Sequence, residues 1–517
     1  MPLCNIPADA ARRWPDNPAL IFRDEPISFA QLDGAITALA AGFVGIGLRP
    51  GDRIALLLPN SPAFVIAYYA ASRAALQVVP CNPMFRPPEL AYIWRDASVR
   101  TVITVSPLTP LAREAAQDAG ALIQLVVAGD SAGIVGDDVR SFDSVLALGS
   151  AGLKNGSIAL PEPPDDGECA VIMYTSGTTG HPKGAMLSHR NLQANVAQVQ
   201  DALEFDHRDR FITVLPLFHS FSGTVCMNTA LSAGCASVLH ESFAPANVLA
   251  SMERHKVSIY AGVPSMHFAL LQQHAAGKAD LGSLRLIASG GSPLPADLLH
   301  DLEERFGVPV LEGDGPTECS PVTSVNRLEG PRKIGSVGPP LRGVEIQIWD
   351  DADQAMPTGE LGEIVVRGDN VMLGYLNQPE ATAEAMRGGW YHTGDVGRLD
   401  EEGFLFIVDR IKDMIITGGL NVYPREVEEV LLQHPAVQDA AVIGMPDALR
   451  GEAVTAVIVL KPDCTAAADA LRSHCEQRLA KYKTPRKFLI RETLPRTATG
   501  KVLKRMLRKE LELGYEA

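Results

Sequence analysis

The chain has 517 residues, which is too many for a single hydrophobic core, so we expect at least two domains. Hydrophobic residues make up 46% of the chain and charged residues 21%, a composition typical of a soluble globular protein. The formal net charge of −15 argues against the basic surface of a nucleic-acid-binding protein.

No window approaches eighteen consecutive apolar residues, and residues 1–16 lack a basic start followed by an apolar run. We therefore expect no transmembrane segment and no signal peptide, and we expect the protein to be cytoplasmic. The eight cysteines form no C-x-x-C pair and show no zinc spacing, so reduced core thiols are expected.

Residues 26–160 and 251–310 alternate between helical and strand periodicity. The predicted helices are Phe29–Gly45 and Phe64–Ala75, and the predicted strands are Arg53–Asn60, Arg100–Val105, Val257–Tyr260 and Leu284–Ala288. Such alternation predicts an α/β fold, in which helices cover parallel β-sheets. From 343 to 408 the predicted strands are shorter and separated by glycines, which indicates a small β subdomain.

A domain boundary is predicted near the charged segment Asp409–Asp413. The compact α/β segment beyond it has predicted helices at Pro424–Leu432 and Ala466–Leu479 and predicted strands at Ala440–Ile443 and Ala453–Leu460. We therefore expect a large N-terminal domain, residues 1–410, and a smaller C-terminal domain, residues 411–517.

Two glycine motifs imitate functional loops. Gly129–Gly133 matches the G-x-S-x-G nucleophile elbow of esterases, but an elbow opens into a helix and residues 134–138 are poor helix formers. Gly45–Gly51 imitates a dinucleotide-binding loop but precedes a strand, so we expect a turn that ends a helix.

The segment Tyr174–Gly184, Y-T-S-G-T-T-G-H-P-K-G, predicts a polyphosphate-binding loop. It continues the apolar run Cys169–Tyr174, a predicted buried strand. Glycines let backbone N–H groups approach an anion, hydroxyls add uncharged donors, and Lys183 supplies a positive charge. The alternative, a flexible surface turn, needs neither the lysine nor a buried strand before it. Because Gly184 follows the lysine and no helix opens there, the loop is not a Walker A motif.

Four further motifs follow in order: Ser289–Leu294 (S-G-G-S-P-L), Glu312–Glu318 (E-G-D-G-P-T-E), Tyr391–Asp395 (Y-H-T-G-D) and Leu494–Lys501 (L-P-R-T-A-T-G-K). Small residues in the first motif let a flat ring lie against the backbone. Glu318 is the kind of ligand that a hard cation bridging phosphates needs, and Asp395 can accept two hydroxyl donors. Together with the loop, these motifs closely resemble the signatures of the adenylate-forming superfamily: acyl-CoA synthetases, nonribosomal adenylation domains and beetle luciferases.

The resemblance covers nearly the whole chain and implies ATP and coenzyme A as substrates and Mg²⁺ as the metal. It assigns the nucleotide site to Thr175, Ser176, Gly177, Thr178, Thr179, Gly180, Lys183, Gly290, Gly291, Ser292, Gly313, Asp314, Gly315, Thr317, Asp395 and Arg410. It assigns catalysis to Lys501, Thr317 and Glu318, the metal to Glu318, the hinge of a mobile C-terminal domain to Lys412, and the thiol tunnel to Gly418 and Gly419.

One position departs from the family pattern. Relatives usually carry an aromatic residue that stacks on adenine where this chain has Asp314. An aspartate cannot stack, although it could accept a hydrogen bond from the exocyclic amine. We still expect ATP as the nucleotide.

The acyl pocket is expected at His219, Gly223 and Gly315. Relatives that activate amino acids carry an aspartate at the position of His219, so its absence favours an acid without an α-amine. Acetate-activating relatives carry a tryptophan at the position of Gly315, so glycine is expected to leave room for a longer or wider acyl group. The segment 311–326 is most similar to bacterial fatty-acid:CoA ligases.

We therefore expect a medium- to long-chain fatty acid:CoA ligase that forms an acyl-adenylate, transfers the acyl group to coenzyme A and releases AMP and pyrophosphate. One alternative is an aryl or cinnamate-type CoA ligase. Another is a non-catalytic nucleotide-binding relative, which the presence of Lys501, Glu318 and Asp395 disfavours. The expected partners are small molecules and no nucleic acid, and a homodimer stays open.

Overall fold

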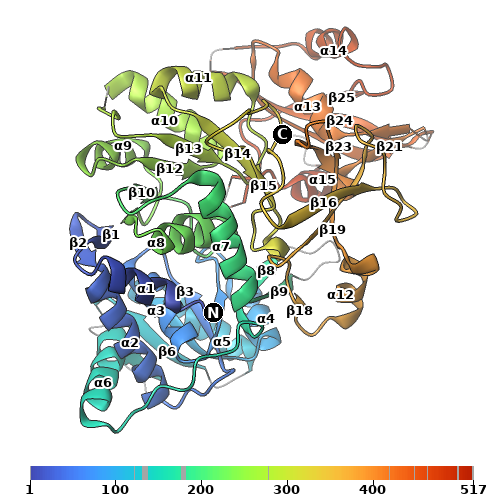
Figure 1. Cartoon of the computed structure of the whole chain (residues 1–517). Helices are drawn as coiled ribbons and strands as arrows, with labels where there is room; N and C mark the ends of the chain where they lie inside the picture. Colours follow the sequence, from blue (N-terminus) through green and yellow to red (C-terminus); the bar gives the residue numbers. More distant parts are fainter. Residues whose placement is uncertain are drawn as a thin grey trace. The chain divides into compact units, whose positions relative to one another are not determined.

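The computed structural model describes residues 2–120, 123–130, 138–175, 182–277, 279–418, 420–447, 449–462, 464–497 and 500–514. These residues form two compact units, which are described separately. The first consists of Met1–Glu345 with Val366–Tyr391, and the second of Ile346–Val365 with His392–Ala517. The predicted α/β fold class is confirmed, since both units combine β-sheets with helices (Figure 1). The proposed functional boundary at 410/411 stays a prediction.

One eight-stranded sheet of the first unit has the order β18-β9-β8-β4-β3-β5-β6-β7. Its strands are β3 (Arg53–Leu57), β4 (Gln77–Pro80), β5 (Val99–Val105), β6 (Gln124–Ala128), β7 (Val139–Ser141), β8 (Cys169–Thr175), β9 (Lys183–Ser188) and β18 (Gly374–Tyr375). The strands from β8 to β7 pair in parallel, whereas β9 is antiparallel to both β8 and β18. This sheet therefore carries the predicted phosphate loop at an antiparallel edge.

The other eight-stranded sheet has the order β15-β14-β13-β12-β10-β11-β1-β2. Its strands are β1 (Pro18–Phe22), β2 (Glu25–Ser28), β10 (Arg210–Thr213), β11 (Ala236–Leu239), β12 (Ile259–Gly262), β13 (Leu286–Ser289), β14 (Val310–Asp314) and β15 (Ser324–Val325). All pairs are parallel except the two at the edges, β1–β2 and β14–β15. Because β13 and β14 are parallel neighbours, the motifs that follow them lie at one edge of the sheet.

Helices pack against both sheets of the first unit (Figure 1). They are α1 (Asn5–Arg13), α2 (Phe29–Gly45), α3 (Pro62–Arg73), α4 (Pro87–Asp96), α5 (Thr109–Ala119), α6 (Phe142–Asn155), α7 (His189–Leu203), α8 (Ala230–Ser232), α9 (Pro245–Arg254), α10 (Pro264–Gly277), α11 (Ala296–Phe306) and α12 (Pro379–Ala385). An apolar core beside β10 to β14 includes Val248, Leu270 and Leu302 from α9, α10 and α11.

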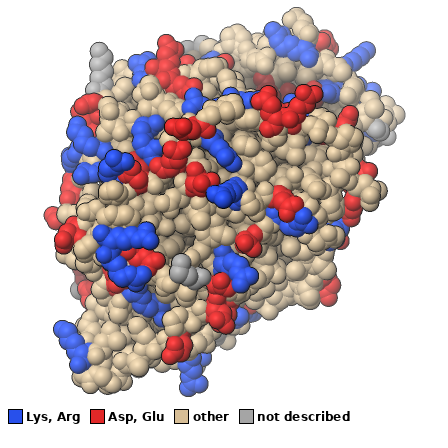
Figure 2. Space-filling model, viewed as in Figure 1, with Lys and Arg blue, Asp and Glu red and all other residues tan. Residues whose placement is uncertain are grey.

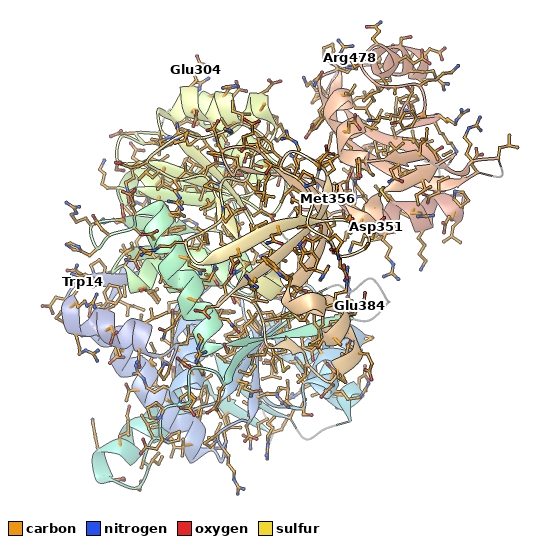
Figure 3. All side chains as sticks on the ribbon, turned by 45° about the vertical axis from the view of Figure 1, so that its right-hand side comes forward. Trp14, Glu304, Asp351, Met356, Glu384 and Arg478 are labelled. Atoms are coloured by element: carbon orange, nitrogen blue, oxygen red, sulfur yellow. The ribbon has the colours of Figure 1, made fainter. Side chains whose placement is uncertain are left out.

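Glycines set the closest helix contacts of this unit. A Cβ on Gly149 of α6 would lie 1.9 Å from the Ala38 carbonyl oxygen of α2, so only glycine allows these two helices to approach so closely. Trp14, which ends α1 and is labelled in Figure 3, fills the space beside Gly234 and stacks on His207.

The second unit contains a sheet of order β22-β21-β24-β23, with β25 paired to β24. Its strands are β21 (Ile415–Thr417), β22 (Leu420–Val422), β23 (Val437–Asp447), β24 (Gly451–Leu460) and β25 (Lys487–Ile490), and its helices are α13 (Pro424–Leu432), α14 (Ala468–Glu476) and α15 (Lys504–Glu512). Val427, Leu471 and Ile458 belong to the core between this sheet and the helices α13 and α14.

Four shorter strands form a separate sheet of order β16-β17-β19-β20, most of whose residues belong to the second unit. They are β16 (Val344–Trp349), β17 (Gly362–Gly368), β19 (Tyr391–Leu399) and β20 (Leu405–Arg410). The turn between β16 and β17, in which Figure 3 labels Asp351 and Met356, is closed by the Met356 N–H donating to the Ile348 carbonyl over 2.7 Å. The predicted β subdomain at 343–408 corresponds to these strands.

Acidic and basic side chains are interspersed over the face drawn in Figure 2. Ion pairs between exposed side chains are frequent, for example Arg367–Glu345 at 2.6 Å. Each such pair contributes only about 0–1 kcal/mol to stability. Among the described residues, no helix combines the length and apolarity that a membrane crossing requires.

Most predicted elements exist, with shifted ends. Helices α2 and α13 begin and end at the predicted residues, and the turn at Gly45–Gly51 ends α2, with Gly47 at φ +92°. The predicted strand Ala440–Ile443 is longer and spans Val437–Asp447. Of the eight cysteines, Cys464 is exposed and the other seven are buried or half-buried. Most of the G-x-S-x-G segment lies outside the described residues.

Candidate active site

The two ends of the predicted phosphate loop lie opposite each other in the first unit. Thr175 at the end of β8 pairs with Lys183 at the start of β9. The Tyr174 side chain is anchored to α4, because its hydroxyl donates to Asp96 Oδ2 of that helix over 2.6 Å. Lys183 begins a strand, as expected for a loop that is not a Walker A motif. The loop residues Ser176, Gly177, Thr178, Thr179 and Gly180 lie outside the described residues.

Glu318 lies beside this loop. It belongs to a short 3₁₀ turn, Thr317–Cys319, and is 7% exposed. Its Oε1 accepts a hydrogen bond from Thr175 Oγ1 over 3.2 Å and another from the Tyr375 hydroxyl over 3.0 Å. The structure thus brings together a threonine and a carboxylate that are 143 residues apart in the chain.

Two tyrosines complete this cluster: Tyr375, which no motif marked, and Tyr391, the first residue of the Y-H-T-G-D motif, to which the sequence assigned no role. The Lys183 Nζ lies 5.1 Å from the centre of the Tyr375 ring, and Tyr391 shares a side-chain hydrogen bond with Tyr375. Burial, followed by the charge of Glu318, raises the pKa of Tyr375 well above its usual value. The phenol therefore stays protonated, and a protonated phenol can donate to the carboxylate.

Glycines allow close packing at the ends of β13 and β14. A Cβ on Gly290 would lie 3.3 Å from both the Gly313 carbonyl oxygen and the Phe221 ring, so a side chain here would require its neighbours to shift. Gly291 has a φ of +75°, which favours glycine. Ser292 follows in the loop, and the Leu294 N–H donates to Glu312 Oε1 over 2.9 Å, which fixes this loop to β14.

Asp314 ends β14, and its backbone is held by β15. The Asp314 carbonyl accepts the Thr323 N–H over 2.9 Å, and Asp314 pairs with Ser324. Thr317 follows shortly afterwards, and its Oγ1 lies 3.1 Å from Ser220 Oγ. The motif Glu312–Glu318 is therefore joined, through Thr317, to the segment that contains His219.

The expectation that Gly315 opens the acyl pocket is wrong. A Cβ at this position would lie 1.6 Å from the Pro321 carbonyl oxygen and 2.9 Å from the Thr323 nitrogen. The missing side chain leaves space that backbone atoms already fill. Gly315 is glycine because the chain folds back against it, so its identity carries no information about the width of the acyl group.

Gly223 has the opposite environment. It is buried within an eight-residue π-helix, η2 (Ser222–Thr229). Apart from this helix's own backbone and its chain neighbours, the nearest described atom to its Cβ position is the Leu217 carbonyl oxygen, at an ordinary contact distance of 3.4 Å. His219 precedes the helix, and its Nδ1 accepts the Phe221 N–H over 3.3 Å. Segments of π-helix frequently occur at functional sites.

Asp395 and Arg410 face each other in the second unit. They are paired residues of β19 and β20, and Arg410 Nε donates to Asp395 Oδ1 over 2.8 Å. The Asp395 N–H donates to Thr393 Oγ1 over 3.0 Å, which orients the turn at Gly394. The structure thus brings together these two residues, both of which the resemblance assigns to the nucleotide site.

The remaining candidates of the second unit lie in turns. Lys412 is exposed in the 3₁₀ turn Ile411–Asp413. Gly418, at φ +61°, follows β21, and its N–H donates to the Arg450 carbonyl over 2.9 Å; Gly419 lies outside the described residues. Lys501 is exposed, and its N–H donates to Thr497 Oγ1 over 3.1 Å, which closes the loop at 497–501.

The fit of a divalent cation depends on Glu318. No group of three or more His, Cys, Asp or Glu side chains suitable for a metal occurs in the described part of the chain. Mg²⁺ commonly binds to one or two carboxylates together with substrate phosphates, so a single carboxylate suffices. Among the described residues, the hydrogen bonds to the Glu318 carboxylate fall on Oε1, so Oε2 is the oxygen that could bind a cation.

Comparisons with known proteins find matches along nearly the whole chain. The family model described as AMP-binding enzyme matches residues 7–376, and the model described as AMP-binding enzyme C-terminal domain matches residues 426–501. A long-chain-fatty-acid–CoA ligase of Bacillus subtilis (strain 168) is 36% identical, covering 98% of this chain and 94% of its own. A feruloyl-CoA synthase of Amycolatopsis sp is 38% identical, covering 97% of this chain and 98% of its own.

Solved structures show the same similarity. ATP-bound MatB from Rhodopseudomonas palustris has a TM-score of 0.89 and 34% identity, covering 100% of both chains. The anthranilate CoA ligase AuaEII in complex with anthranoyl-AMP has a TM-score of 0.91 and 29% identity, covering 99% of this chain and 98% of its own.

Proposed function

The chain belongs to the family of AMP-binding enzymes and is an ATP-dependent acyl-CoA ligase that works through an acyl-adenylate, and we propose that its acid is a medium- to long-chain fatty acid. The long-chain-fatty-acid–CoA ligase of Bacillus subtilis, similar over nearly its whole length, supports this substrate class.

The observation that carries the proposal is the environment of Gly223, where a Cβ would fit at an ordinary contact distance. An alkyl chain needs a deep and narrow apolar channel, and Gly223 is a buried residue whose side-chain direction is not blocked by other described elements. Val225 and Met227 of the same helix are buried and apolar. Gly315, which would have given width near the reacting carboxylate, gives none.

In this proposal the first unit binds the triphosphate and the acid. Thr175, Lys183 and Thr317 stabilise phosphate charge while a carboxylate oxygen of the acid attacks the α-phosphorus. The new O–P bond forms as the bond to the leaving pyrophosphate breaks. Mg²⁺, held by Glu318, would neutralise charge on the phosphate oxygens. The first product is an acyl-adenylate.

Residues of the second unit have separate tasks in the proposal. Asp395 and Arg410 hold the ribose hydroxyls, and Lys501 stabilises charge in the adenylation step. Gly418 and Gly419 guide the thiol of coenzyme A, whose sulfur attacks the acyl carbon and releases AMP. Lys412 is the hinge between the two steps.

An aryl acid is the second candidate. The feruloyl-CoA synthase relative and the anthranilate CoA ligase structure favour it, since both are similar over nearly the whole chain. An aryl acid needs a wide pocket close to the carboxylate, whereas an alkyl chain needs depth.

A panel of acids tests the proposal. Saturated acids of increasing length and cinnamate-type acids are compared by pyrophosphate release, with and without coenzyme A. We expect medium- and long-chain acids to give the highest kcat/KM. Higher kcat/KM for cinnamate-type acids would establish the aryl alternative instead.

The variant Gly223→Leu makes the same test specific to the pocket. If Gly223 borders the acyl chain as proposed, a leucine side chain here should weaken the use of long acids about ten- to a hundredfold while short acids keep their rate. The matched control is Gly34→Leu, at an exposed helical glycine with no neighbouring atom within 4 Å of its Cβ position. An equal loss on every acid would show that Gly223 serves packing and does not border the substrate.

A further inference from the structure

We propose that Tyr375 is a positioning residue that keeps the ammonium of Lys183 and the carboxylate of Glu318 apart, so that both stay available to the metal–nucleotide complex. The inference rests on the proposed function, in which Lys183 binds phosphate and Glu318 binds Mg²⁺. A lysine at position 183 and a glutamate at position 318 do not by themselves predict a role for Tyr375. The contacts among these three residues form only in the folded chain.

The backbone fixes where the Tyr375 side chain lies. β18 is antiparallel to β9, and Tyr375 pairs with Ala185. Lys183 lies two residues before Ala185 and so points to the same face, where diagonal neighbours across a strand pair come within reach of a long side chain. The Leu376 N–H donates to the Gly184 carbonyl over 2.8 Å, and the Tyr375 N–H donates to Thr382 Oγ1 over 2.8 Å.

The side chain of Tyr375 offers a different group to each neighbour. Its ring lies 5.1 Å from the Lys183 Nζ, a distance at which an aromatic face attracts a cation. Its hydroxyl donates to Glu318 Oε1 over 3.0 Å. Thr175 donates to the same oxygen, so the carboxylate is oriented from two sides.

The separation matters because opposite charges in a half-buried site attract strongly. Lys183 and Glu318 both contact Tyr375. Opposite charges at such short range would form an ion pair unless something held them apart. No ion pair joins Lys183 to Glu318 within the part of the chain that the structure describes. The Tyr375 ring attracts the ammonium and its hydroxyl satisfies the carboxylate, so each charge has a neutral partner that a substrate can replace.

Tyr391 helps to orient the Tyr375 side chain. It is 4% exposed, and its side-chain hydrogen bond with Tyr375 joins two phenols in series with Glu318. Hydrogen-bonded chains of this kind polarise each donor and strengthen the bond to the final acceptor.

Two substitutions separate the two contacts. Tyr375→Phe keeps the ring beside Lys183 and removes only the donor to Glu318. Tyr375→Leu removes both contacts. The binding of a non-hydrolysable ATP analogue, α,β-methylene-ATP, is measured by calorimetry at several Mg²⁺ concentrations and in EDTA, so the readout does not depend on turnover.

For Tyr375→Phe we expect about tenfold weaker binding of the analogue in Mg²⁺ and unchanged binding in EDTA, because a hydrogen bond to a charged group is lost. For Tyr375→Leu we expect weaker binding in both conditions, because Lys183 is then free to pair with Glu318. Thermal unfolding of each variant checks that the fold is retained.

The matched control is Tyr482→Phe. Tyr482 also has a lysine beside its ring, Lys483 at 5.7 Å, but it is exposed and belongs to the second unit. This variant should bind the analogue like the unmodified protein.

Wild-type affinity of Tyr375→Phe in both conditions would overturn the proposal, as would an equal loss with and without Mg²⁺. If the unmodified protein itself binds the analogue without any dependence on Mg²⁺, the role assigned to Glu318 fails, and the proposal for Tyr375 falls with it. The two failures are therefore distinguishable.

Discussion

At the scale of single residues, the atoms that surround a side-chain position say more about its role than the residue type does. Gly223 and Gly315 are both glycines in segments expected to border the acyl group, yet a Cβ would fit at Gly223 and would collide with the backbone at Gly315. The Glu318 carboxylate is likewise oriented by Thr175 and Tyr375, which suits it to its proposed role.

The corrected view of Gly315 makes a prediction. Even Gly315→Ala should reduce kcat/KM on every acid by a similar factor, because the Cβ collides with the Pro321 carbonyl and shifts the turn that carries Thr317. Overpacking of this kind costs about 1–3 kcal/mol. The measurement is kcat/KM over acids of different length, with Gly34→Ala as the control. A loss confined to long acids would restore Gly315 as a determinant of chain length.

At the scale of elements, α7 joins the start of the chain to the phosphate-loop sheet. It begins at His189, directly after β9, and the buried His189 Nδ1 accepts the Leu3 N–H over 3.1 Å. Burial lowers the pKa of His189 to about 4. The ring is therefore a neutral acceptor in the folded protein near pH 7.

This contact predicts a pH dependence of stability. In the unfolded chain a histidine titrates near pH 6.5, so below that pH the unfolded state binds a proton that the folded state does not. The contribution is present above pH 6.5 and is lost as the pH falls towards 4, by about 1–3 kcal/mol. Urea unfolding of wild type and His189→Gln at pH 7 and 4.5 measures it, with His300→Gln at an exposed histidine as the control. The same pH dependence in His189→Gln as in wild type would contradict this account.

Elements with strong local signals were predicted well. Helix α2 begins at a capping box in which Ser28 and Gln31 satisfy each other's backbone N–H groups, and Pro424 opens α13 in the first turn, where its missing N–H costs nothing. The π-helix η2 carries no comparable local signal, because its hydrogen-bond pattern depends on what packs around it.

The residues of the candidate site likewise divide into those that a local sequence motif marked and those that it did not. Motifs of contiguous residues marked Lys183, Glu318 and Asp395. Tyr375 was missed because its contacts join segments far apart in the chain, and a lone tyrosine in a strand gives no signal. Tyr391 lies in the Y-H-T-G-D motif, but the sequence does not show its contact with Tyr375. The environment of Gly315 was misjudged because sequence does not show which backbone atoms lie opposite a glycine.

At the scale of the whole molecule, the division into two units is the basis of the proposed two-step reaction. In the proposal, the site residues of the first unit bind the triphosphate and the acid, and those of the second unit supply the ribose contacts, the hinge and Lys501. The proposed hinge, Lys412, lies in a short turn directly after β20.

Restricting the hinge should separate the two steps. Proline at position 412 fixes φ near −65°, so Lys412→Pro should let the acyl-adenylate form but slow its transfer to coenzyme A. Rapid quenching followed by chromatography of acyl-adenylate and acyl-CoA measures both steps. An unchanged overall rate would remove Lys412 as the hinge.

The most direct test of the two-step account is the variant Lys501→Ala, assayed in each half-reaction separately. Pyrophosphate release from ATP and the preferred acid should fall about a hundred- to a thousandfold, as expected when a positioned charge is lost from a reacting phosphate. Conversion of supplied acyl-adenylate and coenzyme A to acyl-CoA should keep nearly its full rate. An equal loss in both half-reactions would contradict the claim that Lys501 acts in the first step alone.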